Sequence, residues 1–402
     1  VGSRAMIYNS TGSSNTALGR RALENNTTAS NNTAVGYQSA YSNTTGIENT
    51  AVGRIAFYTN TTGQENTYLG SASGYYNSTG SNNVGIGRQA LTSNTTASNN
   101  TAVGYKAGYS NTTGVHNIAV GATAMQNTTT GLNNTAVGGA ALISNTTGGT
   151  NTAIGRQALY LNTTASNNTA VGYQAGLAVT TGTLNTFVGA SAGDAVTTGA
   201  NNICIGYDSG SEGVSLTTGS KNILIGNFSN TSAVNVEQEI VIGYDIGGGG
   251  TNTVRIGTPG GNATLGLDGS DTSWAAASDE RLKKDVATST AGLSFIKDLR
   301  PITYKWDAKN AIANTLPQYD ADSTDPVYGS GKTQHGFIAQ EVKAAIDSHS
   351  EIKNGFSMWV EDPDGTQQVA PSALVPMLVK AIQELSAKND ALEARITALE
   401  GN

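Results

Sequence analysis

An asparagine recurs at every seventeenth position through the first half of the chain, and this period constrains the fold more than any other feature. The twelve asparagines of the series are Asn15, Asn32, Asn49, Asn66, Asn83, Asn100, Asn117, Asn134, Asn151, Asn168, Asn185 and Asn202. A glycine stands four residues after each one, from Gly19 to Gly206, and alanine or serine follows three residues later. A strict period of this kind is typical of stacked supersecondary units.

Seventeen residues per unit predict one coil of a β-solenoid. The unit is too short for a pair of helices, and its glycine, asparagine and threonine content opposes helix. We expect two short strands and two turns in each coil. The residue before each glycine is always leucine, valine or isoleucine, and we expect it to form a thin apolar stripe with the small residues of the coil. At about 4.8 Å per coil, twelve coils predict a rod about 58 Å long.

The charge distribution indicates a boundary near residue 277. Residues 1–277 carry 20 charged side chains, whereas the shorter segment 278–402 carries 31. The tryptophans Trp274, Trp306 and Trp359 all lie at or beyond this boundary. After Gly206 the 17-residue phase also slips, and the units become more apolar.

Three segments are therefore predicted. Residues 1–206 form the repetitive shaft, and residues 207–277 form an irregular cap or neck with a linker. Within that neck, 247–250 and 258–271 are predicted to be linkers or loops. Residues 278–402 form a separate small α+β domain. The chain begins inside a repeat unit, so we expect it to belong to a longer protein.

A heptad seam closes the chain and predicts a coiled coil over 374–400. Its steps of four and three residues run through Leu378, Ile382, Leu385, Asn389, Leu392, Ile396 and Leu399. The single polar member, Asn389, is a device that fixes register and the number of helices. Because each solenoid coil has little apolar surface of its own, three chains around one axis would bury more, which favours a homotrimer.

Several classes of function are disfavoured by composition. A formal net charge of −7 gives no basic footprint for nucleic acid. No apolar run is long enough to span a membrane, so no membrane insertion is expected, and no signal segment opens the chain. The single cysteine, Cys204, excludes an intrachain disulfide framework and a cysteine-based zinc site. We expect no cofactor and no metal.

A second asparagine series fits the acceptor pattern for N-glycosylation. Its members are Asn9, Asn26, Asn43, Asn60, Asn77, Asn94, Asn111, Asn145 and Asn162. The alternative is that they are turn residues that recur because the coil recurs, and the sequence favours this interpretation.

The C-terminal segment has the patterning of an ordinary domain. Residues 278–285 alone are typical of a helix start, with Ser278 as its N-cap. Residues 291–299 predict a short amphipathic helix that stops before Pro301. A strand is expected at 303–306, and residues 336–342 are expected to lead into another helix.

Two resemblances to known families follow from these motifs. The shaft repeat resembles the β-roll heads of trimeric autotransporter adhesins and stretches of phage tail fibres, although its unit is longer than the usual adhesin coil. The C-terminal segment resembles the intramolecular chaperone domain of phage tailspikes and tail fibres, a self-cleaving serine-peptidase family. The residues that carry the second resemblance are Ser278, Asp279, Arg281 and Lys283, then Leu299, Arg300, Pro301, Tyr304 and Trp306, and then 335–342.

The resemblance implies a domain that trimerises, nucleates folding of the preceding fibre and then releases itself. Because Ser278 opens both the motif block and the change in composition, we expect the cut at Ala277–Ser278. The family's nucleophile falls on Ser278 and its lysine base on Lys283. A spacing of five residues does not align side chains on a helix, so this motif is expected to be a turn or extended segment. Lys380 is the alternative base. The motif residues Asp279 and Arg281 and the lone His335 are candidate supports for the site, and His335 also suits a purely structural role.

The leading function is a tail fibre or tailspike of a phage or related virus, made in the host cytoplasm and carried on the virion, that attaches to a host-cell surface receptor. A glycan is one candidate receptor. The alternatives are a bacterial surface adhesin with the same modules and a polysaccharide depolymerase. Glycosidases need paired carboxylates, and residues 15–206 contain only Glu24, Glu48, Glu65 and Asp194, which disfavours the depolymerase.

Overall fold

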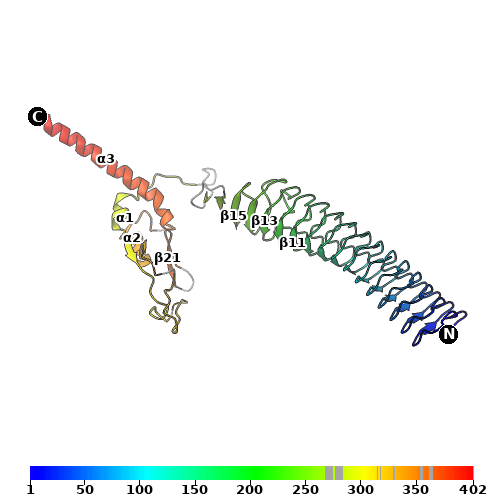
Figure 1. The fold of residues 1–402 in the computed structure, drawn as a ribbon. Coiled ribbons are helices and arrows are strands. Elements are labelled where there is room, and N and C mark those ends of the chain that lie inside the picture. Colours follow the sequence, from blue (N-terminus) through cyan, green and yellow to red (C-terminus); the bar gives the residue numbers. More distant parts are fainter. Residues whose placement is uncertain are drawn as a thin grey trace. The chain divides into compact units, whose positions relative to one another are not determined.

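A computed structural model describes residues 1–267, 275–276, 284–314, 316, 318–328, 331–353, 356–361 and 365–401. The chain divides into two compact units, residues 1–278 and residues 279–402. The first consists of strands and turns, and the second combines short strands with helices (Figure 1). Each unit is described by itself.

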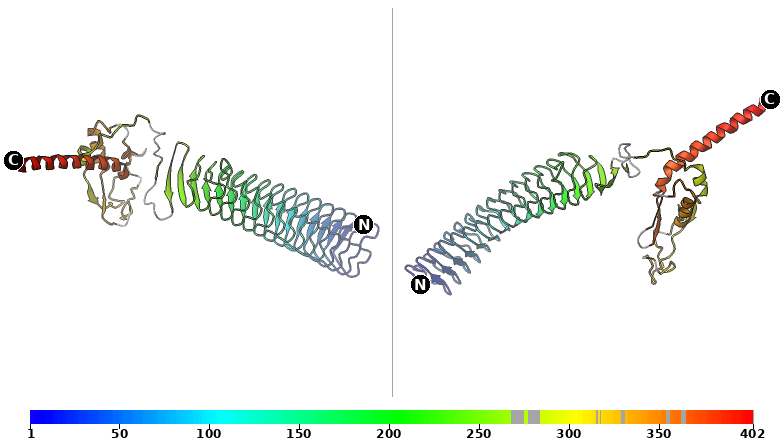
Figure 2. Two further views of the ribbon diagram at one scale, coloured as in Figure 1. Left: turned by 90° about the horizontal axis from the view of Figure 1, so that it is seen from above. Right: turned by 180° about the vertical axis from the view of Figure 1, so that it is seen from behind.

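The first unit is the predicted β-solenoid, in which each 17-residue repeat forms one coil. A three-residue strand ends just before the repeated glycine and pairs in parallel with the strand of the next coil, as Thr33 does with Thr50. Figure 1 and Figure 2 show these coils stacked one after another along the solenoid. The expected second strand in each coil is wrong. Left-handed residues such as Gln89 (φ 62°) and Leu91 (φ 48°) follow the glycine, and this backbone cannot continue an extended ladder.

The strands of the coils are short until the last two. They are β1 (Thr16–Leu18), β2 (Thr33–Val35), β3 (Thr50–Val52), β4 (Thr67–Leu69), β5 (Val84–Ile86), β6 (Thr101–Val103), β7 (Ile118–Val120), β8 (Thr135–Val137), β9 (Thr152–Ile154), β10 (Thr169–Val171), β11 (Thr186–Val188), β12 (Ile203–Ile205), β13 (Ile223–Ile225), β14 (Glu239–Gly243) and β15 (Thr253–Thr258).

An antiparallel hairpin follows the last parallel strand. Strand β16 (Gly261–Gly266) pairs with β15, and β17 (Ala275–Ala276) pairs with β16. The expectation that residues 258–271 form only linkers or loops is therefore wrong for β16. Pro259 and Gly260 supply turn chemistry, and here the turn joins two six-residue strands.

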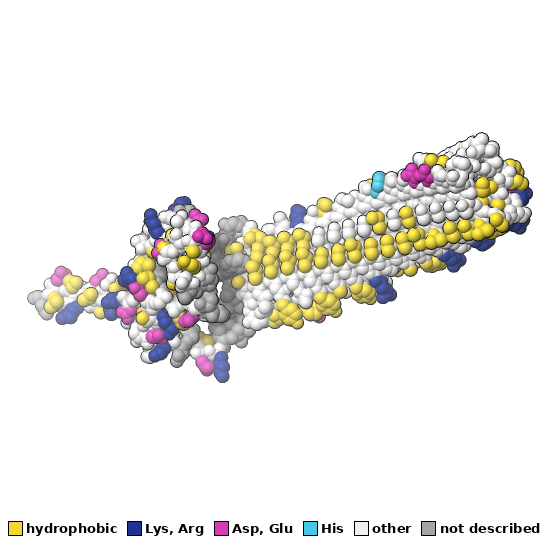
Figure 3. All heavy atoms as spheres, turned by 90° about the horizontal axis from the view of Figure 1, so that it is seen from below, with side chains coloured by type: hydrophobic (Ala, Val, Ile, Leu, Met, Phe, Trp, Pro, Cys, Tyr) yellow, Lys and Arg dark blue, Asp and Glu magenta, His cyan; other side chains and the backbone are white. Residues whose placement is uncertain are grey.

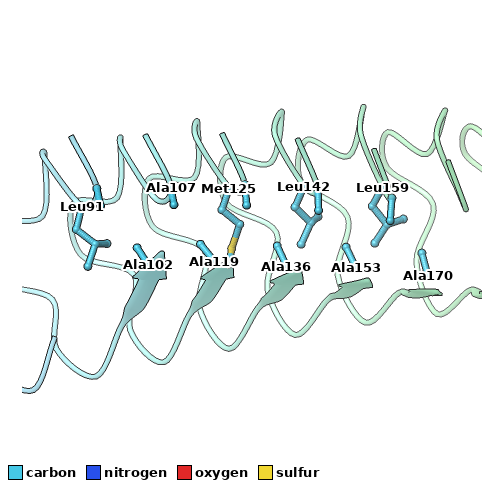
Figure 4. Close-up of a cluster of buried hydrophobic side chains, with 14 of the residues drawn as sticks. Leu91, Ala102, Ala107, Ala119, Met125, Ala136, Leu142, Ala153, Leu159 and Ala170 are labelled. Carbon is cyan, nitrogen blue, oxygen red and sulfur yellow. The ribbon is translucent and has the colours of Figure 1, made fainter. Parts of the chain in front are cut away.

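The core of the solenoid lies between the strands and the facing turns. Figure 4 shows Ala119 and Ala136 pointing from their strands toward Met125 and Leu142 on the opposite side. All four side chains are buried. Val137, next to Ala136 on the same strand, points outward and is 36% exposed. The aliphatic residue before each glycine therefore lies outside the core, and the expectation of one apolar stripe that combines it with the small residues is wrong.

Large core residues occur where the facing turn has a glycine. The ring of Tyr68 lies so close to Gly74 that an added Cβ would be 2.4 Å from it. Phe187 stands in the same relation to Gly193, where a Cβ would lie 2.3 Å from the ring. At these two positions the ring takes the space that a side chain on the turn would occupy, because native cores leave little free volume.

The 17-residue asparagine series forms a buried ladder from coil to coil, which we call the strand ladder. Asn100 donates from Nδ2 to the carbonyl of Gly114 at 3.0 Å. Its Oδ1 accepts the backbone N–H of Asn117 at 2.9 Å. The ladder ends at Glu239, whose N–H donates to Asn222 and whose carboxylate accepts the N–H groups of Ser232 and Gly250. These bonds satisfy backbone groups that would otherwise be buried without partners.

The second asparagine series forms a parallel ladder at the opposite turn, the turn ladder. Asn43 donates to Asn26 Oδ1 at 3.0 Å and to the carbonyl of Gly46 at 2.9 Å. Apart from the half-buried Asn9, every member of the series is buried. A glycan could not be attached to a buried amide nitrogen that already donates two hydrogen bonds, so the turn interpretation of these residues is the one that fits the structure.

The repeated glycine after each strand is required by the approach of the next coil. Gly138 has φ 138°, and a Cβ at this position would lie 2.4 Å from the carbonyl oxygen of Gly155. Only glycine adopts this backbone without strain. The glycine therefore sets the close stacking that the hydrogen-bonded ladders need.

The described residues of the second unit form two short helices, two antiparallel strand pairs, a short 3-10 helix and one long helix. Its elements are α1 (Leu293–Asp298), β18 (Ile302–Tyr304), β19 (Gln334–Gly336), α2 (Ala339–Ser348), β20 (Trp359–Glu361), β21 (Gln367–Val369), η2 (Pro371–Leu374) and α3 (Val375–Glu400). The two predicted helices are confirmed as α1 and α2. The core of the unit is Ala291, Phe295, Val342, Ala345, Ile346, Ile352, Met358 and Leu374.

Replacing Asn100 with alanine is predicted to destabilise the shaft strongly. The change leaves the N–H of Asn117 and the carbonyl of Gly114 buried without their partners, at roughly 1–3 kcal/mol each, so roughly 2–6 kcal/mol in total. Chemical denaturation followed by circular dichroism measures the loss. Thr96→Ala, which removes an exposed hydroxyl four residues before Asn100, serves as the control and should change the denaturation midpoint little. Equal effects of the two changes would contradict the role of the ladder.

Candidate functional site

The predicted cleavage residues lie outside the described part of the chain. These are Ala277, Ser278, Asp279, Arg281 and Lys283. Their two flanks are described. On one side, β17 ends at Ala276, which pairs with Ala263. On the other side, residues 284–290 are exposed and lie outside any helix or strand. The predicted scissile bond thus begins one residue beyond Ala276, the last residue paired into the shaft sheet.

The alternative base, Lys380, is engaged within the second unit. Its Nζ lies 3.6 Å from Glu384 Oε1. Glu384 also accepts the backbone N–H of Leu293 at 2.9 Å, and this hydrogen bond is the main cause that lowers the pKa of Glu384. The Lys380 ammonium is thus paired with a carboxylate of its own helix.

Motif blocks that are separated in sequence meet in the second unit. Strand β18 pairs antiparallel with β19, and Thr303 lies opposite His335. Arg300, just before β18, forms an ion pair with Glu341 at the start of α2. This pair raises the pKa of Arg300 and lowers that of Glu341, in each case mainly through their hydrogen bond. The second and third blocks of the resemblance therefore form one structural element.

An aromatic-lined cavity of about 770 Å³ adjoins this element. Tyr304, Trp306 and Tyr328 all line it. Trp306 contacts both tyrosines edge to face, with ring centroids 5.2 and 4.8 Å apart. His335 is exposed on β19 and also lines the cavity. His335, the predicted support for the cleavage site, therefore lines an apolar pocket. Its contact with the cleavage residues stays a prediction.

A histidine that sequence reasoning did not single out has two carboxylate partners in the second unit. His349, with a side chain 12% exposed, lies 2.8 Å from Asp298 and 3.1 Å from Glu351. It also contacts Phe295 edge to face. The hydrogen bond with Asp298 is the main cause that raises the pKa of His349, although burial opposes it. No motif marks this residue, because Asp298 lies 51 positions away in α1 and Glu351 follows in a turn.

The heptad seam lies on α3 with its apolar side chains exposed. Ile382 is 66% exposed and Leu399 is 71% exposed. Asn389 is exposed as well. The start of α3 packs on α1, where Glu384 caps Leu293. Beyond Glu384, every residue of α3 is exposed within this unit. Such a helix has an apolar face that no other described residue covers.

The shaft carries a second uncovered apolar surface, which we call the outer row. It consists of the aliphatic residues that precede the coil glycines: Leu18, Val35, Val52, Leu69, Ile86, Val103, Val120, Val137, Ile154, Val171, Val188, Ile205, Ile225, Ile242 and Ile256. All are half-exposed or exposed. Figure 3 shows them as a continuous hydrophobic row along the solenoid. Continuous apolar surface of this length is typical of interaction sites.

Glu24 and Asp194 of the shaft do not form a glycosidase-like pair. Glu24 is buried and bound by Arg4 and Arg21, and its hydrogen bond with Arg21 is the main cause that lowers its pKa. A general acid needs the opposite shift. Burial raises the pKa of Asp194, but this residue lies ten coils away from Glu24 along the solenoid.

Two further searches were limited to the described residues. Among them, no group of three or more histidine, cysteine, aspartate or glutamate side chains could hold a metal ion. Within the same ranges, no helix is long and apolar enough to cross a membrane.

Comparison with known proteins identifies the C-terminal domain. Residues 278–350 match a peptidase family described as chaperone of endosialidase. The match begins at Ser278, directly after the shaft, and it spans the blocks that pair as β18 and β19. The chain therefore combines a repeat-based β-solenoid shaft with a C-terminal domain of this chaperone type. No curated protein and no solved structure matches the chain.

The second unit is predicted to lose stability as pH rises through the pKa of His349. The folded pKa is raised above the usual value of about 6.5, so the stabilisation is fully present below that value and is lost above it. Denaturation of the full chain, followed by tryptophan fluorescence at pH 6 and pH 8, measures the effect. The midpoint should fall toward pH 8 in the natural protein and fall less in His349→Gln. An identical fall in both would show that His349 contributes nothing.

Proposed function

We propose that the chain is the precursor of a homotrimeric viral fibre, of the tail-fibre or tailspike kind, that attaches to a host-cell surface receptor. In this proposal the C-terminal domain assembles three chains, guides folding of the shaft and then separates by cutting Ala277–Ser278. The observation that carries the proposal is the position of the family match, which begins at Ser278 where the sheet-paired shaft has just ended at Ala276.

The uncovered apolar surfaces support assembly with copies of the same chain. The outer row runs along the shaft, and the α3 seam is a separate exposed apolar face within the second unit. Parallel copies would bring each row and each seam against equivalents from neighbouring chains, which closes the assembly under cyclic symmetry. An uncovered shaft would instead expose long apolar surface during folding, a condition that leads to aggregation.

The number three rests on the family resemblance rather than on the helix. In the seam, isoleucine occupies a positions and leucine occupies d positions, with Asn389 at one a position. In parallel coiled coils this combination by itself favours two strands. A trimer therefore requires that the chaperone domain or the shaft impose the threefold arrangement on α3.

The proposed cleavage is an acyl transfer within one peptide unit. Ser278 Oγ attacks the carbonyl carbon of Ala277 while Lys283 accepts the hydroxyl proton. The C–N bond then breaks, the amine of Ser278 takes up that proton, and an ester joins Ala277 to Ser278 Oγ. Water hydrolyses the ester, leaving a carboxylate on Ala277. Arg281 and Lys284 would favour the neutral form of Lys283, because nearby positive charge disfavours an ammonium.

Release of the chaperone would make the folding of the shaft irreversible. A shaft that has lost residues 278–402 no longer has the domain that assembled it, so its persistence depends on the rate of unfolding. Cleavage after assembly would then act as a checkpoint that only a correctly formed fibre passes.

Substitution at the two proposed catalytic positions is predicted to stop cleavage but not assembly. Ser278→Ala and Lys283→Ala should each leave one 41.0 kDa chain on a denaturing gel, whereas the natural protein should give two fragments. Ser289→Ala, at an exposed serine nearby, is the control and should be cut normally. Mass spectrometry should place the end of the shaft at Ala277, and any other end rejects the site. Normal cutting of Lys283→Ala together with loss of cutting in Lys380→Ala would reassign the base to Lys380.

Disrupting the helical seam is predicted to prevent both assembly and cutting. Leu385→Asp and Leu392→Asp place charges in the apolar contact between helices, whereas Ala391→Asp places one on the outside of the same helix. Light scattering should give three chains for the natural protein and for Ala391→Asp, and aggregates or single chains for the seam variants. Residues 1–277 expressed without the chaperone should aggregate. A soluble monomer of 1–277 would contradict the proposal.

A further inference from the structure

The shaft contains a longer repeat of four coils, superimposed on the 17-residue period. Residues 88–105 and 156–173 are identical at all but two positions, and residues 20–37 differ from 88–105 at three. The three segments start 68 residues apart. The asparagines, the glycines, the core residues and hydrogen-bonding side chains such as Thr95 and Ser98 account for much of this identity. The arginine and the tyrosine that also recur are exposed, and their recurrence calls for a reason beyond folding.

Each of the three segments places an arginine against a tyrosine of the next coil. The arginines immediately follow a coil glycine, and the tyrosines occupy the same position one coil later. The guanidinium carbon lies 5.9 Å from the ring centroid in Arg20–Tyr37, 5.8 Å in Arg88–Tyr105 and 5.9 Å in Arg156–Tyr173. All six side chains are exposed. The Arg–Tyr contact therefore occurs three times, and in the second pair Lys106 also lies 5.5 Å from the centroid of the Tyr105 ring.

The pairs are separate sites rather than parts of a continuous row. In the coils between the second and third pairs, this position holds Ala122 and Gly139. Four coils at about 4.8 Å each separate successive pairs by about 19 Å. Figure 3 shows basic side chains spaced at intervals along one edge of the shaft, beside hydrophobic ones.

The positive charge of these arginines is not neutralised within the described part of the shaft. The nearby Glu24 is bound by Arg4 and Arg21 and not by Arg20. No ion pair of Arg88 or Arg156 occurs among the described residues. Arg54, at the same coil position, is exposed but makes no such ring contact within these ranges.

We infer that each Arg–Tyr pair is a subsite for an anionic saccharide, so that the shaft binds an acidic polysaccharide at three places. A guanidinium held over a ring is oriented to bind a carboxylate or sulfate through two parallel hydrogen bonds. The adjacent tyrosine offers an apolar ring face and a hydroxyl to a sugar ring. In the third site, Gln174 also donates to Gln157 at 3.2 Å beside the pair, which adds amide groups suited to sugar hydroxyls.

Repetition makes weak subsites effective. A polymer that bridges sites about 19 Å apart binds the second and third sites at high effective concentration. This inference rests on the proposed attachment function and specifies the chemistry of the receptor. It requires no enclosed pocket, because affinity comes from several equal contacts.

Binding of defined polysaccharides to the assembled full chain tests the inference. The probes are polygalacturonate, dextran sulfate and uncharged dextran, each immobilised for biolayer interferometry. The natural protein should bind one or both charged polymers and not dextran, and the polymer bound identifies carboxylate or sulfate as the anion. The triple variant Arg20→Gln, Arg88→Gln, Arg156→Gln should bind at least about tenfold more weakly. Arg54→Gln is the matched control and should bind as the natural protein does.

Three outcomes would overturn the inference. The first is failure of the natural protein to bind either charged polymer, and the second is equal binding by the triple variant. The third is a changed assembly mass of the triple variant in light scattering, which would assign the pairs to contacts between chains. Failure of the attachment fibre itself is distinguishable. If light scattering shows that the natural protein remains a single chain, the proposed function is contradicted. The binding of the arginine variants to charged polymers can still be compared in that case.

Discussion

The coil-to-coil hydrogen bonds of the buried asparagines are the interaction on which the shaft depends. Each asparagine of the strand ladder satisfies one carbonyl and one N–H of the backbone inside a structure that has only three strand residues per coil, as Asn100 does for Gly114 and Asn117. A carboxamide can donate and accept at the same time without carrying charge. Neither serine nor aspartate offers both functions over this reach, which explains why the asparagine recurs while its neighbours vary.

A coil held by these hydrogen bonds is narrow, and its width determines which side chains lie on the surface of the shaft. The interior accepts alanine opposite leucine, or an aromatic ring opposite glycine, as with Tyr68 and Gly74. It has no room for a branched side chain at every strand position. The aliphatic residues of the outer row are therefore on the surface, where their burial requires another chain. This agrees with the proposed function, in which the C-terminal domain assembles several copies of the chain.

Much of the fold could be predicted from the sequence, and the failures have physical causes. The period, the glycine and the turn residues predict coils, and the 3.6-residue and heptad patterns predict α1, α2 and α3. Strand alternation separates Ala136 from Val137, but it does not say which face is inside. Hydrophobicity favours valine for the interior, whereas the width of the coil favours alanine. The β15–β16 hairpin was missed because Pro259 and Gly260 are equally typical of a linker.

The cleavage site was predicted from a motif whose residues lie outside the described ranges, so its geometry is a matter for experiment. The segments that follow the motif are described. The motif blocks around Arg300 and Glu341 meet through β18 and β19, which a pattern of separated residues does not reveal. His349 was missed for the same reason, since its partners Asp298 and Glu351 come together only through the packing of α1 and α2.

The central claim is that the outer row is covered by other copies of the chain. Thiol labelling of a single cysteine placed at Val137, with Cys204 replaced by alanine, tests it directly in the assembled full chain. The account predicts slow labelling at Val137→Cys in the assembly and fast labelling at Thr147→Cys, an exposed position one turn away on the same coil. Equally fast labelling at both positions would contradict it.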